Sequence, residues 1–333
     1  MTETMRAWRV HRNGEPREVM SLDEVDRPAP GPGQALVRVL AVAVNFPDVL
    51  LARGEYQVRP EPPFVPGIEM CAEVVEVGAD VDRVAVGDRV VGSHIGVLSE
   101  YAVLDQGLLH RAPAALDDAQ AAALTVAYQT AWFGLHRRAG LREGETLLVH
   151  AAAGGVGTAA CQLGVAAGAR VIGVVGSEAK AAVARAAGAE HVLLRSDDVA
   201  ARVKELTGGG GADVVFDPVG GSSFAASTKC IAFEGRIVVV GFASGEIPPV
   251  RANHALVKNY GVLGLHWGLY AQRDPALVDA AHADLVRLAD AGAVRPVVAD
   301  VVDLTKAPEA IELLATGTTT GRLVVEVATA GAA

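Results

Sequence analysis

The amino-acid sequence predicts an α/β protein that combines a β-rich domain with a doubly wound parallel sheet. Short runs dense in valine, separated by turns rich in proline and glycine, occupy the first third of the chain. From about residue 119, strand-like segments alternate with helical ones, which is the pattern of a parallel sheet covered by helices on both faces. A chain of 333 residues also exceeds one ordinary domain, so two hydrophobic cores are expected.

The β-rich part contains two segments that we predict to be strands, residues 35–43 and 71–77. Residues 45–54 form the one short helix expected in this region. Turn signals separate these elements at residues 28–33, 60–63, 66–67 and 87–88.

The alternating part begins with an alanine-rich helix, predicted over residues 119–140. The strands that follow are short and rich in Val, Ile or Leu, at residues 146–150, 170–175, 191–194, 212–216, 236–240 and 262–265. Helices are expected to begin near Val156 and Glu178, between the first three strands. A long helix over residues 277–291 comes next, and two short strand-like segments end the chain.

Charge and composition exclude several classes of protein. The formal net charge of −10 argues against a nucleic-acid partner, because phosphate binding requires a basic surface. No stretch of about 18 apolar residues is present, and residues 1–11 lack the apolar core of a secretory signal. The scattered Cys71, Cys161 and Cys230 are expected to be small buried residues in a reducing compartment. We therefore expect a cytoplasmic protein without a membrane partner.

A glycine-rich turn carries the clearest functional signal. The predicted strand that ends at His150 leads into Ala151-Ala-Ala-Gly154-Gly155-Val156-Gly157 and then into an apolar helix. Glycines here allow a tight turn and close backbone approach, and the helix N-terminus offers free N–H groups to a pyrophosphate. Ala152 stands where the usual motif has its first glycine, which leaves the backbone argument intact. The turn predicts a Rossmann domain that binds a dinucleotide.

The end of the next predicted strand indicates which dinucleotide. An NAD site prefers an acidic residue there, whereas this chain has Ser177 and Lys180, which can bind a 2′-phosphate. Glu178 is evidence to the contrary, unless it acts as a helix cap. Arg195, just past the third strand, either closes the phosphate pocket or is a solvated surface residue. NADPH is the predicted cofactor.

The motifs taken as a set resemble one family over nearly the whole chain. The matching segments are His150–Gly157 with Cys161-Gln162, Asn45-Phe-Pro-Asp48 with Gly54-Glu-Tyr56, Pro66-Gly-Ile-Glu69, Gly87-Asp-Arg-Val90, Asp217-Pro-Val-Gly220, Glu234–Phe242 and Thr320-Gly-Arg322. Together they resemble the zinc-independent NADPH:quinone oxidoreductases, the zeta-crystallin-like branch of the medium-chain dehydrogenase/reductase superfamily. Quinone reductases of that family often have Tyr at the place of Arg195. The Arg of this chain departs from that pattern but suits a 2′-phosphate.

The resemblance implies a discontinuous domain layout. A GroES-like substrate and catalytic domain is expected from residues 1–125 plus 268–333, with the Rossmann NADPH-binding domain, residues 126–267, inserted in it. It also implies a homodimer whose Rossmann domains pair through the stretch from Ile247 to Leu265.

The resemblance also argues against zinc. Zinc-dependent members of the superfamily carry Cys near the place of Asn45 and Gly-His-Glu where this chain has Gly67-Ile68-Glu69. Without that His and without a run of cysteines, neither zinc site of the superfamily can be assembled. No Lewis acid is then expected to polarise an alcohol, which argues against alcohol dehydrogenation.

Site residues follow from the family likeness. Asn45 and Thr125 are expected near the nicotinamide, and Asn45 is also a catalytic candidate, with a loop cap as the alternative. Phe242 is expected to pack along the cofactor, with ordinary core as the alternative. Gly154, Gly155, Val156, Gly157, Ser177, Lys180, Arg195 and Arg322 complete the cofactor-binding set.

Tyr56 is the second catalytic candidate. In related enoyl-thioester reductases the Tyr of the matching Gly-x-Tyr donates a proton after hydride addition, although a half-buried loop Tyr is an equal reading. The favoured activity is hydride transfer from NADPH to a quinone or similar electron-poor conjugated carbonyl. Two alternatives stay open: an enoyl-thioester reductase that uses Tyr56, and an NADPH-dependent binding protein without enzymatic activity.

Overall fold

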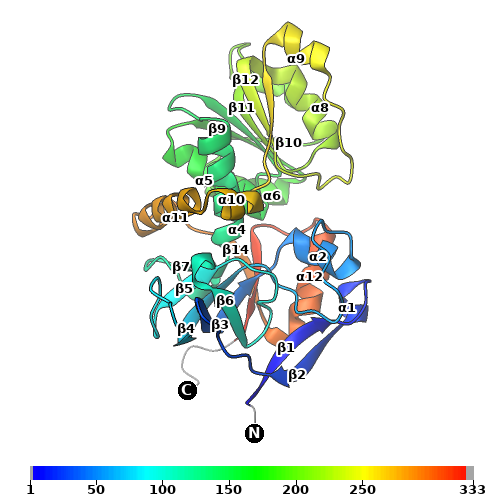
Figure 1. The fold of residues 1–333 in the computed structure, drawn as a ribbon. Helices are drawn as coiled ribbons and strands as arrows, with labels where there is room; N and C mark the ends of the chain where they lie inside the picture. The colour runs from blue at the N-terminus through cyan, green and yellow to red at the C-terminus, as the bar shows by residue number, and fades with distance from the viewer. Residues whose placement is uncertain (1–2, 328–333) are drawn as a thin grey trace. The chain divides into compact units, whose positions relative to one another are not determined.

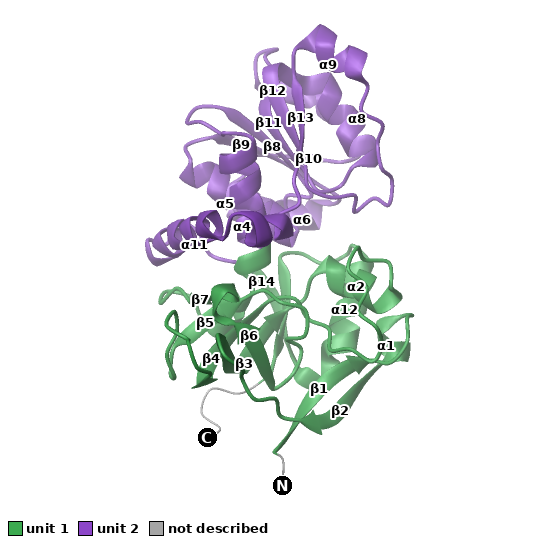
Figure 2. Cartoon of the chain, viewed as in Figure 1, with its two compact units in different colours: residues 1–126, 298–333 green, residues 127–297 purple. Residues whose placement is uncertain are grey.

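The structure, a computed structural model, describes residues 3–327, which divide into two compact units. Unit 1 comprises Met1–Val126 and Val298–Ala333, and unit 2 comprises Ala127–Val297 (Figure 2). The predicted return to the first domain, at residue 268, lies 30 residues before the observed one at Val298.

The later return has a packing cause. Val278 and Ala281 of α11 (Pro275–Asp290) bury themselves against Phe133 in unit 2. The indole Nε1 of Trp132 donates to Asp284 of α11 at 2.9 Å, and Phe133 also stacks with Tyr270 at a centroid distance of 4.2 Å. This apolar cluster holds α11 in unit 2.

Unit 1 is the β-rich unit (Figure 1). β1 (Thr4–Val10) and β2 (Met20–Asp26) form an antiparallel pair. The larger sheet has seven strands, in the order β14-β15-β3-β4-β5-β7 with β6 paired to β3. Its strands are β3 (Gln34–Ala43), β4 (Met70–Val77), β5 (Arg89–Gly92), β6 (Tyr101–Asp105), β7 (Leu109–Arg111), β14 (Val298–Asp303) and β15 (Arg322–Glu326). The helices of this unit are α1 (Pro16–Val19), α2 (Phe46–Arg53), α3 (Asp118–Ala122) and α12 (Ala307–Ala315).

The last strand closes this domain. β15 pairs antiparallel with β3, with Val324 opposite Ala43, so a segment from the end of the chain completes the sheet begun by the first third. Valines of β3 and β4, among them Val37 and Val74, are fully buried and pack in one cluster with Ile311 of α12. Burial of these branched side chains supplies the main stabilisation of the unit.

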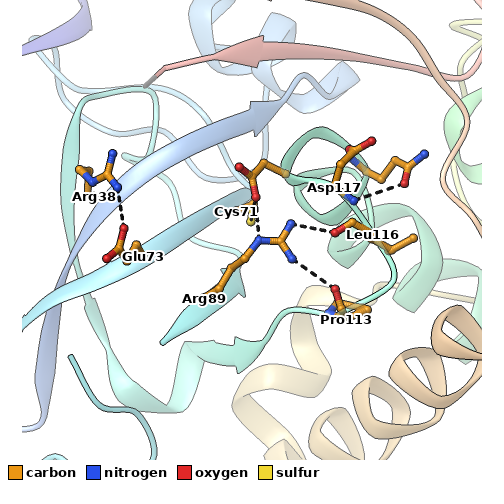
Figure 3. A network of polar contacts seen from close by, with 9 residues as sticks. Arg38, Cys71, Glu73, Arg89, Pro113, Leu116 and Asp117 are labelled. Carbon is orange, nitrogen blue, oxygen red and sulfur yellow. Dashed lines mark hydrogen bonds and ion pairs between the residues drawn. The ribbon is translucent and has the colours of Figure 1, made fainter. Parts of the chain in front are cut away.

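Arg89 of β5 fixes the loop that leaves the sheet toward α3 (Figure 3). Its guanidinium donates to the Asp118 carboxylate at 2.6 Å and to the carbonyls of Pro113 and Leu116 at 3.2 and 3.0 Å. Asp117 then caps α3 by accepting from the third helical N–H. The chain entering the next helix is thereby held in a defined position.

The three cysteines are buried and free, as predicted. Burial raises the pKa of Cys71 and of Cys161 to about 12 and that of Cys230 to about 11, so the thiols stay protonated at neutral pH.

Unit 2 contains a six-stranded, wholly parallel sheet in the order β10-β9-β8-β11-β12-β13. The strands are β8 (Thr146–His150), β9 (Arg170–Val175), β10 (His191–Leu194), β11 (Ala212–Asp217), β12 (Ile231–Val239) and β13 (Gly261–Gly264). The helices are α5 (Gly155–Ala166), α6 (Glu178–Ala186), α7 (Val199–Leu206), α8 (Gly221–Cys230), α9 (Ala252–Lys258), α10 (Gly268–Arg273) and α11. The order reverses at β8, which is the doubly wound arrangement that the sequence predicts, and the α/β fold class is confirmed.

The alanine-rich helix predicted over residues 119–140 is three helices. α3 ends at Ala122, α4 (Thr125–Trp132) starts afresh, and a π-helix (Phe133–Arg138) follows. The new start at Thr125 coincides with a side chain, Glu69, that takes a backbone N–H of the first turn of α4. A periodicity argument cannot detect such a contact. Within residues 3–327, no helix is long and apolar enough to cross a membrane.

Candidate functional site

The turn between β8 and α5 has the geometry that phosphate binding requires. The Ala152 N–H donates to the Val174 carbonyl of β9 at 3.0 Å, which draws the turn against the sheet. A Cβ on Gly157 would lie 2.1 Å from the Ala151 carbonyl oxygen, so only glycine fits there. Gly154 is the N-cap residue of α5, and the N–H groups that follow have no acceptor within the helix. Backbone donors and the positive end of the helix dipole are therefore aimed out of the turn.

Two cations gather at the end of β9. The Arg195 N–H pairs with the Val175 carbonyl at 2.8 Å, and its guanidinium Nη2 lies 3.2 Å from the position a Cβ would take on Gly176. Burial, and next the charge of Arg195, lower the pKa of Lys180. Ser177 is the N-cap of α6, yet its hydroxyl makes no capping bond. Arg195 is exposed, and together with Lys180 it makes this end of β9 positively charged.

A pocket of about 310 Å³ opens beside these cations in unit 2. Its lining includes Arg195, His150, Ser223 and Lys229. His150 is the last residue of β8 and is 1% exposed. Burial lowers its pKa, so the ring is neutral. Ser227 donates its hydroxyl hydrogen to the Ser223 carbonyl at 2.9 Å, so it accepts from Nε2 of His150 at 2.8 Å. That bond leaves Nδ1 of His150 as a hydrogen-bond acceptor.

Phe242 lies on the surface of unit 2. Its ring is 40% exposed, which excludes the ordinary-core alternative, and one ring carbon lies 3.0 Å from the Cβ position of Gly220. Gly220 has φ +73° and donates its N–H to Asp217 at 3.0 Å, so a glycine is required where the ring approaches the turn. An exposed aromatic face of this kind is available for stacking.

Unit 1 carries a second polar site, built around Asn45. Asn45 joins β3 to α2 as the N-cap residue of that helix and is 3% exposed. Its side-chain amide donates to the Ala43 carbonyl at 3.0 Å and to Oε1 of Glu69 at 2.8 Å.

Glu69 gathers several predicted residues. Its Oε1 also accepts from the guanidinium of Arg322, the first residue of β15, and its Oε2 accepts from the Val126 N–H at 2.7 Å. The neighbouring Thr125 is 2% exposed, and its hydroxyl has no hydrogen-bond partner among residues 3–327. Asn45, Thr125 and Arg322, which are 80 or more residues apart in sequence, thus lie around one buried carboxylate.

Asp48 has a structural place in this site. Its carboxylate accepts from the backbone N–H of Asn45 at 2.8 Å and from that of Gly67 at 3.2 Å, which fixes α2 against the loop before β4. Asp48 is 2% exposed, and its burial raises its pKa to about 7.

Tyr56 follows α2 and is half-buried. Its N–H donates to the Leu50 carbonyl at 3.2 Å. Burial, and then the negative charge of Asp48, raise the pKa of Tyr56. The phenol therefore stays protonated at neutral pH and keeps its capacity to donate a hydrogen bond or a proton.

Both units match known protein families. Residues 31–114 match the alcohol dehydrogenase GroES-like domain, and residues 155–282 match the zinc-binding dehydrogenase domain. Quinone oxidoreductase-like protein 2 homolog of Nematostella vectensis is 40% identical over 299 residues, 89% of this chain and 82% of that protein. The mouse quinone oxidoreductase-like protein 2 is 36% identical over 96% of this chain and 92% of its own length.

Solved structures agree. The quinone oxidoreductase of Pseudomonas syringae superposes with a TM-score of 0.89 at 33% identity, over 97% of this chain and all of that one. The Escherichia coli quinone oxidoreductase in complex with NADPH superposes with a TM-score of 0.88 at 31% identity, over 98% of this chain and all of that one. The chain belongs to the quinone oxidoreductase family of the medium-chain dehydrogenases/reductases.

A more distant likeness reaches a multidomain enzyme. A mycocerosic acid synthase-like polyketide synthase of Mycobacterium tuberculosis is 35% identical over 92% of this chain, which spans only 15% of that protein.

This quinone oxidoreductase family member also has a residue in its site that sequence reasoning missed. That residue is Glu69, which the sequence marks only as the end of the Pro66–Glu69 motif. The sequence alone does not show what its carboxylate binds. The available signal is an acid flanked by Ile68 and Met70 at the start of a buried strand, since a charge in such a place needs partners. Among residues 3–327, no group of three or more His, Cys, Asp and Glu side chains is arranged to hold a metal ion.

Proposed function

We propose that the protein transfers a hydride from NADPH to a quinone or a similar electron-poor conjugated carbonyl, without zinc. The observation that carries the proposal is the pairing of the glycine turn with the cationic site of Lys180 and Arg195 at the end of β9. A pyrophosphate and a 2′-phosphate are the two anions that such an arrangement fits. Its membership of the quinone oxidoreductase family supports the same cofactor and acceptor class.

We propose cofactor-binding roles for residues of each unit. The N–H groups of Gly155, Val156 and Gly157 would bind the pyrophosphate, with Gly154 shaping the turn through its own N–H bond to the Ala151 carbonyl. Ser177, Lys180 and Arg195 would bind the 2′-phosphate. The pocket beside Arg195 would take the adenosine, and Phe242 is our candidate for stacking. At the nicotinamide end we propose Asn45 and Thr125, whose unpartnered buried hydroxyl is available to a carboxamide. Arg322 would act there through Glu69.

The chemistry suits a site without a metal. When bound, the cofactor supplies the hydride. A quinone is already electrophilic, so the protein need only orient it and exclude water. The side chain of Ile68 has no donor atom for zinc, which supports the proposal that this position binds no metal.

Enoyl-thioester reduction is the second candidate, favoured by Tyr56. Tyr56 is half-buried and its phenol is protonated, which is the form that a proton or hydrogen-bond donor must have. The likeness to part of a mycocerosic acid synthase-like polyketide synthase supports keeping this candidate.

One experiment separates these candidates. The purified, chelator-treated protein is supplied with NADPH and, in turn, phenanthrenequinone, benzoquinone and crotonyl-CoA, while loss of NADPH absorbance is followed. Turnover of quinones supports the proposal. Turnover of crotonyl-CoA alone would replace it with enoyl reduction, and Tyr56→Phe would then abolish the activity. Binding of NADPH without any turnover would leave the non-enzymatic binding protein.

We also propose that the protein is a cytoplasmic homodimer. β13 is the edge strand of the unit 2 sheet, and the stretch from Ile247 to Leu265 exposes large apolar side chains. The exposed fractions are 72% for Ile247, 54% for Val250 and 76% for both Leu256 and Val257. Four large apolar side chains this exposed within eleven residues support an interface in this stretch. Three buried free thiols suit a reducing compartment, which cell fractionation would test.

A further inference from the structure

Glu69 connects the candidate residues of unit 1 through a fully buried carboxylate. We propose that Glu69 is a positioning residue for hydride transfer, whose carboxylate fixes the Asn45 amide and the start of α4 in one arrangement. The inference rests on the proposed function, because it concerns the reactive end of that site.

The Asn45 amide has one permitted orientation. Both hydrogens of its Nδ2 go to oxygens, the Ala43 carbonyl at 3.0 Å and Oε1 of Glu69 at 2.8 Å. A flipped amide would place Oδ1 against these two oxygens, neither of which carries a hydrogen. Glu69 and the Ala43 carbonyl together therefore determine where the Asn45 side-chain oxygen points.

The second carboxylate oxygen fixes the start of α4. Val126 belongs to the first turn of this helix, so its N–H has no acceptor within the helix. Oε2 of Glu69 accepts that N–H at 2.7 Å and places negative charge at the positive end of the helix. The adjacent Thr125, with its unpartnered buried hydroxyl, is positioned by the same bond.

A carboxylate is the only group that satisfies this set. All three partners of Glu69 are N–H donors, and Arg322 supplies the positive charge that a fully buried carboxylate requires. The isosteric Gln would turn an NH₂ group toward one of these donors. The side-chain volume would stay the same, but either the hydrogen bond to the Val126 N–H or those to Asn45 and Arg322 would be lost.

The test is a double-mutant cycle of Glu69→Gln and Asn45→Ala, with phenanthrenequinone as acceptor. We expect Glu69→Gln alone to lower kcat by about 10- to 100-fold, the effect of misplacing a reacting geometry by roughly 1 Å. In the Asn45→Ala background, Glu69→Gln should lower kcat by less than about 3-fold, because the side-chain amide that Glu69 positions is absent. The primary deuterium isotope effect with 4-deuterated NADPH should rise in Glu69→Gln, as hydride transfer becomes slower than the other steps.

Controls separate positioning from folding. NADPH affinity, measured by cofactor fluorescence, should change by less than about 3-fold, because the phosphate-binding residues lie in unit 2. Glu73→Gln removes another ion pair of β4, with Arg38, and should leave kcat unchanged. If Glu69→Gln does not fold, Glu69→Asp keeps the charge but is one methylene too short to reach both ends, and it should show the same loss of kcat.

The outcomes distinguish the two claims. Wild-type turnover with unchanged kcat in the Glu69 variants would overturn this inference alone. If the losses of kcat in the two single variants multiply in the double variant, or if the isotope effect does not change, the inference is also overturned. Glu69 would then have only a structural role. A wild-type protein that binds NADPH but reduces no quinone would overturn the proposed function and this inference with it.

Discussion

At the residue scale, both candidate sites are built around charged side chains. Lys180 and Arg195 bear like charges, and the charge of Arg195 contributes, after burial, to the lowered pKa of Lys180. In unit 1 the charges are instead balanced, because Glu69 meets Arg322 in a buried pair. The sequence predicts a phosphate site at the end of β9, because Ser177 and Lys180 follow directly on a predicted strand. It does not predict the role of Glu69, because its partners Asn45 and Arg322 are adjacent only after folding.

Arg195→Ala tests the phosphate site. Loss of a charge-assisted hydrogen bond to the 2′-phosphate should raise the Kd for NADPH by about 10- to 100-fold and leave the Kd for NADH nearly unchanged. Isothermal titration with both cofactors measures the ratio. Arg202→Ala, an exposed Arg of α7 paired with Glu205, is the matched control. Equal losses for both cofactors would show that Arg195 does not read the phosphate.

Asp48 gives a pH dependence of defined sign. Its pKa is about 7 when folded and near the ordinary 3.8 when unfolded, so the folded protein holds the proton more tightly. Its contribution to the free energy of unfolding should therefore fall as pH rises from about 4 to about 7 and then level off.

Denaturant titrations of the wild type and of Asp48→Asn across that range test this sign. The difference between the two proteins isolates Asp48 from the other carboxylates, some of which have lowered pKa values. A difference that does not vary with pH would contradict the assignment.

At the element scale, the strands of unit 2 are the best-predicted part of the fold. β8, β9 and β10 have the predicted limits, because each is a short buried apolar run between turns. The helix expected over residues 119–140 is divided instead, and Glu69 supplies an acceptor at the new start of α4. This is a tertiary contact, which helix periodicity does not record.

The glycine turn before α5 yields a prediction of its own. Gly157→Ala would force a Cβ to within 2.1 Å of a backbone oxygen, so the turn must shift. We expect a loss of about 1–3 kcal/mol in the free energy of unfolding and a large loss of NADPH affinity. Gly154→Ala meets the same oxygen at 3.3 Å and should fold with a much smaller loss. Thermal denaturation and NADPH titration of both variants make the comparison, and equal behaviour would contradict the close-approach argument.

At the scale of the whole molecule, the two units reflect the discontinuous course of the chain. The resemblance anticipated that the chain returns to the β-rich unit, but α11 packs with Phe133 and delays the return to Val298. The acceptor could not be derived from the sequence, because it depends on the residues that surround the reactive end of the cofactor.

The proposed homodimer is tested at this scale. Leu256→Lys with Val257→Lys places two charges in the exposed apolar stretch of α9, and we expect a dimer to become a monomer. Light scattering coupled to gel filtration gives the mass. Leu313→Lys, at a 46% exposed site on α12 of unit 1, should leave the mass unchanged. A wild type that is monomeric at micromolar concentration would contradict the proposal.

The most direct test of the central claim is the kcat/KM for phenanthrenequinone of metal-stripped protein, measured with NADPH and with NADH on samples whose zinc content is determined. The account predicts full activity at negligible zinc and a clear preference for NADPH. Activity that disappears with the zinc and returns on its addition, or a preference for NADH, would contradict it.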